Sequence, residues 1–315
     1  MRLLVTGSSG FLGGSVGRLA KRDGHQVLGV SRSPSPTGDW PGKFVQFDVS
    51  DPGLVGVIRD FAPDVIWHTA GPASVSRSVE APLDDLRAAL LPWANTLDCV
   101  RRAGLRPLIL FPSSAAVYGE PASMPVTETA RIAPISPYGF HKVACEALAR
   151  EYADCYGLNV VICRLFSTVG AAQKRLLIWE LYEQLIGPES TVWLQGSGTE
   201  GRDYLGIDDI WSVLAALIQT TEPRKNAGRF FVINIASGTE TCVLTVAEQL
   251  RDLIAPSKAL GCRDTTLPGD PRRWCADVSR LRSLVPEWQP QPLWSALASC
   301  VDTWQKERQL AAPRR

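Results

Sequence analysis

Three glycines near the N-terminus constrain the fold of this chain more than any other feature. They are Gly7, Gly10 and Gly13 of the segment GSSGFLG. The apolar run RLLVT (residues 2–6) stops at the first of these glycines, which is typical of a buried strand. Residues 11–24 follow with apolar residues at helical spacing and end at a further glycine. A glycine loop that joins a strand to a helix in this way indicates an α/β chain.

The spacing of this loop suits a dinucleotide. The first glycine permits a tight turn, the second lets the backbone approach a pyrophosphate, and the third allows the helix to pack closely on the strand. The phosphates would lie at the helix N-terminus, where the free N–H groups near Phe11 and Leu12 and the helix dipole favour negative charge. We therefore predict that the loop binds the phosphates of a dinucleotide cofactor.

Strands alternate with helices through the first half of the chain. Short apolar runs predict further strands at residues 26–30, 43–49, 64–70, 107–111 and 159–166. Two longer stretches read as helices, at residues 81–104 and 138–157. This alternation predicts an α/β fold with a doubly wound parallel sheet, the Rossmann fold. In such sheets ligands bind beyond the carboxyl ends of the strands.

The alternation loosens after residue 167, where segments rich in glycine, proline and tryptophan begin. We expect residues 1–167 to form the dinucleotide-binding Rossmann domain and residues 168–315 to form mainly a smaller substrate-binding lobe. The segment RFFVINIA (residues 229–236) is an expected strand that returns to the main sheet.

Composition and charge exclude several kinds of partner. Hydrophobic residues make up 45% of the chain and the net charge is +1, so we expect a folded protein with no attraction to nucleic acid. The eight cysteines contain no C-x-x-C pair and the three histidines are far apart, which predicts no metal site. The first apolar run breaks at Thr6, and no later stretch approaches the about eighteen apolar residues of a membrane span. We expect a cytoplasmic protein.

The segment YGFHK contains a candidate proton-transfer pair. Tyr138 and Lys142 are four residues apart on an expected helix and therefore lie on one face. An ammonium group close to a phenol favours the phenolate form. Tyr138 could thus act as a base toward a hydroxyl group or as an acid toward a ketone.

The glycine loop and the tyrosine–lysine pair together resemble the extended short-chain dehydrogenase/reductase family. Its members are NAD(P)-dependent sugar-nucleotide epimerases, dehydratases and reductases. The resemblance implies that Tyr138 transfers the proton and that Lys142 both tunes Tyr138 and binds the cofactor ribose. It also implies a homodimer, formed by the expected helices at 81–104 and 138–157.

The segment SSAAVYG narrows the reaction within that family. The resemblance implies that Ser114 hydrogen-bonds the substrate oxygen beside the tyrosine, whereas Ser113 is expected to be a turn serine at the strand end. The 4,6-dehydratases of the family carry Asp-Glu after this position. Here Ala115 and Ala116 follow, and alanine neither donates nor accepts a proton. Epimerisation through a transient ketone, or net reduction of a ketone, remains.

Candidate substrate contacts lie in the second half of the chain. GRDYLGIDDI (residues 201–210) resembles a family segment in which an arginine, here Arg202, contacts the nucleotide diphosphate. PGDPRRWCAD (residues 268–277) resembles a second such segment, with Arg272 or Arg273 as the candidate. Ser167 stands where the family usually has an asparagine on the diphosphate. Such departures leave the base and the sugar of the nucleotide sugar open.

The end of the second strand bears on the choice of dinucleotide. An NAD site usually has an acidic residue there, bonded to the ribose, but this chain has Ser31 followed by Arg32, which could bind a 2′-phosphate. We therefore favour NADP over NAD as the cofactor. The resemblance implies further cofactor contacts at the ends of the third and fourth strands, which do not discriminate between NAD and NADP. They are Asp48, Val49, Ala70 and Gly71.

These features predict an enzyme that performs hydride chemistry on a nucleotide-activated sugar. An epimerase acting at sugar carbon 4 is favoured. The first alternative is an NADPH-dependent reductase of a 4-keto-6-deoxy sugar nucleotide, which fits Arg32 better. The second is a non-catalytic protein that senses the dinucleotide.

Overall fold

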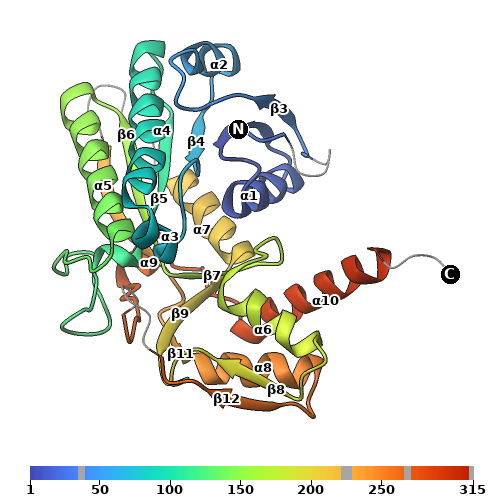
Figure 1. Cartoon of the computed structure of the whole chain (residues 1–315). Helices are drawn as coiled ribbons and strands as arrows, with labels where there is room; N and C mark the ends of the chain where they lie inside the picture. Colours follow the sequence, from blue (N-terminus) through green and yellow to red (C-terminus); the bar gives the residue numbers. More distant parts are fainter. Residues whose placement is uncertain (35–39, 221–228, 266–270, 312–315) are drawn as a thin grey trace.

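The main body of the protein is a seven-stranded parallel sheet, seen in the computed structural model, which describes residues 1–34, 40–220, 229–265 and 271–311 (Figure 1). Each strand is parallel to its neighbours, and buried parallel strands read as continuous apolar runs. In spatial order the strands are β10 (Arg229–Ile235), β6 (Asn159–Leu165), β5 (Leu108–Ser114), β4 (Val65–His68), β1 (Arg2–Thr6), β2 (Gln26–Ser31) and β3 (Lys43–Gln46).

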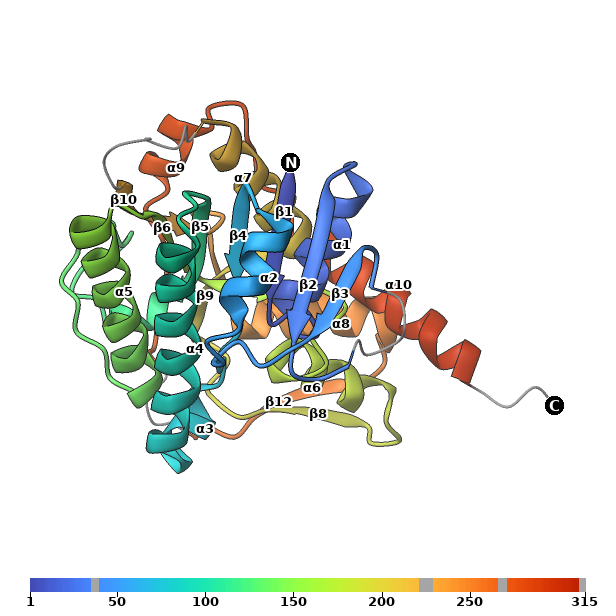
Figure 2. The same cartoon turned by 90° about the horizontal axis from the view of Figure 1, so that it is seen from above.

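Helices cover both faces of this sheet (Figure 2). One face packs against α1 (Phe11–Arg22), α7 (Ile207–Thr220) and α9 (Ser279–Leu284). The opposite face packs against α2 (Leu54–Phe61), α4 (Pro82–Ala103) and α5 (Pro137–Tyr156). The doubly wound Rossmann arrangement predicted from the sequence is confirmed.

The strand order reverses between β1 and β4, whose carboxyl ends lie side by side. Thr6 is paired with His68 in this register. The crevice at such a reversal is the usual ligand site of an open α/β sheet. The glycine loop between β1 and α1 lies at this point.

A smaller lobe is built from the later part of the chain. Its strands form two small sheets, one of β11 (Glu240–Cys242), β9 (Gly201–Gly206) and β7 (Ser167–Val169), the other of β12 (Ala259–Cys262) and β8 (Thr191–Leu194). The helices α6 (Leu176–Ile186), α8 (Val243–Ile254) and α10 (Leu293–Ala311) share one apolar core with these strands. In Figure 1 this lobe lies below the carboxyl ends of the main strands.

Part of the chain after residue 167 belongs to the main sheet. The segment expected to return there forms β10, which pairs with β6. Helix α7 packs against α1, and its apolar residues Ile210, Val213 and Leu214 join the core of the sheet. The two short helices α3 (Val75–Glu80) and η1 (Ala115–Val117) lie at strand ends of the main sheet.

Candidate active site

The glycine loop packs tightly against the end of β4. Gly7 has φ of +63°, in the left-handed region that favours glycine, and a Cβ there would lie 2.6 Å from the carbonyl oxygen of Thr69. A Cβ at Gly13 would lie 2.5 Å from Thr69 Oγ1. Both positions therefore need glycine if the loop is to lie this close to the strand.

The N-terminus of α1 is open for an anion. Gly10 is the N-cap residue and supplies no side chain to cap the helix, and the first turn holds no acidic residue. The N–H groups at the start of a helix have no intrahelical partner, so those of Phe11 and Leu12 contribute to a positive potential at this end of α1. This arrangement fits the phosphates of a dinucleotide.

The end of β2 carries no carboxylate. Ser31 is buried, and its Oγ lies 2.5 Å from Ser9 Oγ of the glycine loop. Arg32 is exposed, and its carbonyl oxygen accepts a hydrogen bond from Gln46. The hydrogen bond between the two serine hydroxyls links the glycine loop to β2. Arg32, the next residue after Ser31, is exposed to solvent.

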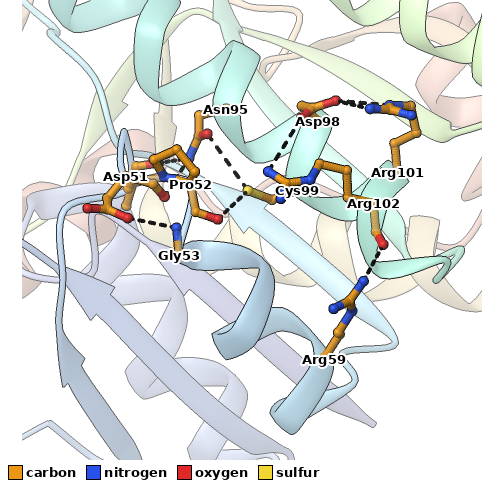
Figure 3. Close-up of polar contacts among 10 residues, drawn as sticks. Asp51, Pro52, Gly53, Arg59, Asn95, Asp98, Cys99, Arg101 and Arg102 are labelled. Carbon is orange, nitrogen blue, oxygen red and sulfur yellow. Dashed lines mark hydrogen bonds and ion pairs between the residues drawn. The ribbon is translucent and has the colours of Figure 1, made fainter.

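The segment after β3 is held by α4, as Figure 3 shows. Asn95 Nδ2 donates hydrogen bonds to the carbonyl oxygens of Val49 (2.7 Å) and Asp51 (2.9 Å). The thiol of Cys99, one turn further along α4, donates to the carbonyl of Pro52 at 3.6 Å. Asp48 is exposed and Val49 buried. These bonds fix the turn at which the adenine contact is predicted.

A buried histidine lies behind the predicted cofactor residues Ala70 and Gly71. His68 Nδ1 is 3.0 Å from Thr6 Oγ1, which also accepts a hydrogen bond from the backbone N–H of Ala70. Burial lowers the pKa of His68 to about 3, and the positive charge of Lys142 acts in the same direction. The imidazole is therefore neutral. Sequence reasoning missed His68, because a lone histidine in an apolar run carries no motif.

The predicted proton-transfer residues converge at the carboxyl end of β5. Ser114 is the last residue of β5, and its Oγ accepts a hydrogen bond from the backbone N–H of Ala116. A Cβ at Gly139 would lie 2.6 Å from the carbonyl oxygen of Ala116, so the first turn of α5 touches η1 directly. Tyr138, half-buried, is in that same turn.

Lys142 lies one turn after the tyrosine and points to the same region. Its Nζ is 5.6 Å from the centre of the Tyr138 ring and 4.8 Å from that of Phe111. The ammonium group donates a hydrogen bond to the carbonyl oxygen of Pro112 at 2.9 Å. Lys142 is buried, so its charge acts on the phenol through a medium of low dielectric constant.

Ser114 lies at the strand end as expected, but Ser113 has a different role from the one predicted. Ser113 was predicted to be a turn serine, but it lies within β5, is buried, and donates to Glu146 Oε1 at 2.6 Å. Ser114 forms the turn instead, since it caps η1. The strand runs three residues beyond the expected end because Ser113 and Ser114 pair with β6 in register.

The predicted substrate residues lie along one seam of the small lobe. Arg202 in β9 is buried, donates to the carbonyl oxygens of Gly201 and Arg272, and lies 5.6 Å from the Trp274 ring centre. Arg273 is exposed and paired with Glu240 at 2.5 Å. This ion pair directs the guanidinium group of Arg273 to the neighbouring strand β11.

Ser167 lies at the start of β7, where it pairs with Tyr204 of β9.

A cavity of about 770 Å³ lies between the glycine loop, α7 and α10. Ser114, Tyr138 and Lys142 are not among the residues that line it. The cavity therefore lies beside the glycine loop and not at the three predicted proton-transfer residues.

Among the described residues, no three histidine, cysteine, aspartate or glutamate side chains are grouped so that they could bind a metal ion. No helix in this part of the chain is both long and apolar enough to span a bilayer.

Known proteins resemble the chain over nearly its whole length. UDP-glucose 4-epimerase of Mycolicibacterium smegmatis is 28% identical, covering 98% of this chain and 100% of the relative. UDP-glucuronic acid decarboxylase 6 of Arabidopsis thaliana is also 28% identical, over 92% of this chain and 84% of the relative.

Solved structures agree with these relatives. UDP-glucose 4-epimerase of Thermotoga maritima, solved with UDP-glucose, superposes with a TM-score of 0.87 at 25% identity, covering 98% of this chain and 100% of that one. MoeE5, solved with UDP-glucuronic acid and NAD, superposes with a TM-score of 0.86 at 26% identity over the same shares. The model of the NAD-dependent epimerase/dehydratase family matches residues 3–236. The chain belongs to this family, within the extended short-chain dehydrogenases/reductases.

Proposed function

We propose that this protein is an NAD-dependent sugar-nucleotide epimerase that inverts the configuration at carbon 4 of the sugar in a UDP-sugar. The observation that carries the proposal is the convergence of Ser114, Tyr138 and Lys142 at the carboxyl end of β5, on the same edge of the parallel sheet as the glycine loop after β1. The family match and the full-length similarity to UDP-glucose 4-epimerases support it.

The residues present fit a dinucleotide. The glycine loop packs closely against the end of β4, and the N-terminus of α1 beside it has no side-chain cap, so its first N–H groups are available to phosphates. Bound NAD would supply the acceptor and the donor of a hydride. Ser9 and Ser31 would meet the adenosine ribose, Asn95 would hold the adenine-binding turn, and Lys142 would contact the nicotinamide ribose.

Their placement supports the following roles for the chain's own groups. Tyr138 takes the proton from the sugar hydroxyl as the ketone forms and returns it as the hydroxyl is restored. Ser114, which is half-buried at the strand end, orients the same oxygen. Lys142, whose Nζ lies 5.6 Å from the centre of the Tyr138 ring, places a positive charge beside the phenol.

The buried alanine pair favours epimerisation over dehydration. Ala115 and Ala116 are 0% and 5% exposed, and η1 places them directly after Ser114. Loss of water from a sugar needs an acid and a base at the neighbouring carbons, and neither alanine can act as one. Hydride chemistry at one carbon requires only the groups present.

The substrate lobe would bind the nucleotide. Arg202 is the main candidate for the diphosphate, because it is buried beside Trp274 at the seam between β9 and the segment that carries Arg272. Arg272 and Ser167 are further candidates. Arg273 would have to leave Glu240 to take part.

The assembly and location proposed from the sequence remain part of this proposal. Helices α4 and α5 lie side by side (Figure 1) and present the exposed apolar side chains Leu83, Leu91, Phe140 and Tyr156, which would be covered in a homodimer. All eight cysteines are unpaired, which fits the reducing cytoplasm.

An NADPH-dependent ketoreductase is the second candidate. The observation that favours it is the absence of an acidic residue at the end of β2, where Ser31 and Arg32 stand. Arg32 is exposed and forms no ion pair with any of the described residues, so it could approach a 2′-phosphate. We retain a preference for NADP only for this second candidate.

The test uses the purified protein with UDP-galactose and no added cofactor, followed by NMR of the anomeric protons. We expect conversion to UDP-glucose, release of stoichiometric NAD⁺ on denaturation, and a loss of turnover of at least about 100-fold in Tyr138→Phe with an unchanged melting temperature. UDP-glucuronate is assayed in parallel, and release of carbon dioxide would point to a decarboxylase. Conversion only with NADPH consumption would replace the proposal with the reductase.

A further inference from the structure

A buried ion pair lies directly behind the proposed proton-transfer residues. Arg164 of β6 contacts Glu146 of α5 through two hydrogen bonds, Nη2 to Oε2 at 2.7 Å and Nε to Oε1 at 3.0 Å. Their side chains are only 5% and 11% exposed. Burying two charges costs much of what their attraction returns, so such a pair is weak evidence for stability. Its neighbours indicate another role.

The pair ties β5 to α5 next to Ser114. Ser113 Oγ donates to Glu146 Oε1 at 2.6 Å, and the carbonyl oxygen of Pro112 accepts from Lys142 Nζ at 2.9 Å. Two consecutive strand residues are thus bound to two helix residues four apart, on the face that also carries Tyr138. Two such bonds fix the strand relative to the helix both along and across its axis.

The same pair holds the turn on the other side of Ser114. Arg164 Nη1 donates to the hydroxyl oxygen of Tyr118 at 2.9 Å, and that hydroxyl donates to Asn234 Oδ1 of β10 at 2.7 Å. Burial raises the pKa of Tyr118, so its hydroxyl remains available as a donor. Tyr118 follows η1 directly, so Ser114 is held both before and after in the chain.

We propose that Glu146 and Arg164, acting through Ser113 and Tyr118, are positioning residues that keep Ser114 in register with Tyr138 and Lys142. The inference rests on the proposed function for its effect on turnover. Its structural content, the immobilisation of residues 114–118, stands apart from the reaction. Neither side chain needs to touch substrate, because both are buried behind the strand end.

The experiment compares five variants of the full chain, one of which, Ser113→Thr, keeps the hydroxyl group of residue 113. Ser113→Ala and Glu146→Gln each remove part of the network. Thr96→Val removes a buried hydroxyl bond within α4, and Asp154→Asn makes the acid-to-amide change in an exposed ion pair further along α5. For each variant we measure kcat and KM for UDP-galactose, NAD content, melting temperature and hydrogen–deuterium exchange of residues 114–118.

We expect Ser113→Ala to lower kcat about tenfold with KM changed less than twofold, because a small misplacement of reacting groups costs rate rather than binding. Exchange in residues 114–118 should rise about tenfold in Ser113→Ala and Glu146→Gln, and stay unchanged in both controls. Ser113→Thr, which keeps the hydroxyl, should restore most of the turnover.

Unchanged exchange and unchanged kcat in Ser113→Ala would overturn the inference, as would equal losses in Thr96→Val. A wild-type protein that turns over no nucleotide sugar would refute the proposed function instead. In that case exchange alone decides on the positioning role, because it needs no turnover. If Glu146→Gln fails to fold, Ser113→Ala carries the test, since it leaves the ion pair intact.

Discussion

His68 gives the sharpest prediction about the pH dependence of stability. Its ring is buried between Trp93 and Phe111, Nδ1 lies by Thr6, and Nε2 is buried with no hydrogen-bond partner in the described structure. Burial lowers its pKa from 6.5 to about 3. Below about pH 6.5 the unfolded chain therefore binds a proton at this residue that the folded protein excludes, and the fold loses stability as the pH falls toward 3.

The size of this loss follows from the two pKa values. Between pH 8 and pH 5 the extra proton binding of the unfolded state at His68, integrated over pH, amounts to about 1.5 pH units, which corresponds to about 2 kcal/mol of unfolding free energy. Replacing His68 with Gln removes the titration while keeping a polar group for Thr6. We expect the variant to be less stable than the wild type at pH 8, but to lose about 2 kcal/mol less between the two pH values.

The assay is urea denaturation at pH 8 and pH 5, followed by tryptophan fluorescence and by circular dichroism. His25→Gln serves as the control, because His25 is only partly buried and should leave most of the wild-type dependence in place. If His68→Gln and the wild type lose the same stability between the two pH values, His68 is not held neutral and the reasoning from burial is wrong.

Three further predictions concern single substitutions. Burial raises the pKa of Asp209 to about 6, so the fold loses stability as the pH rises from about 4 to 7. In urea titrations, Asp209→Asn should therefore increase the free energy of unfolding by up to about 3 kcal/mol at pH 8 and change it little at pH 4. Gly7→Ala should cost about 2–5 kcal/mol, from its positive φ and its contact with Thr69, and should release the bound dinucleotide, measured by absorbance after gel filtration. Ser31→Asp should weaken NADPH binding at least about tenfold while leaving NAD binding within about threefold, measured by calorimetry; equal changes in both would place the ribose elsewhere.

Much of the main sheet could be predicted from the sequence. The expected strand at residues 2–6 and the helix that begins at residue 11 coincide with β1 and the start of α1, since the apolar run and the glycines mark both limits. The strand expected at 159–166 is β6, buried at every position. Such strands are identified by local pattern alone, because both faces are covered by helices.

Short helices and contacts between distant segments could not be predicted from the sequence. Helices α2 and α3, for example, are too short to show a clear helical pattern and were missed. In the small lobe β7 pairs with β9 and β8 with β12, and no local pattern selects these partners. Glu146 looks like an ordinary helix residue in the sequence. Its two hydrogen-bond partners, Ser113 and Arg164, come together only because they pair with each other in neighbouring strands.

Transfer of an isotopic label tests the central claim most directly. UDP-galactose deuterated at carbon 4 of the sugar is incubated with the enzyme in ordinary water, and the product is examined by NMR and mass spectrometry. If the hydride that leaves carbon 4 returns to the other face of the same carbon, the product UDP-glucose keeps its deuterium at that carbon. Exchange of the label for solvent hydrogen, or a product that lacks it because NADPH supplied the hydride, would contradict the account.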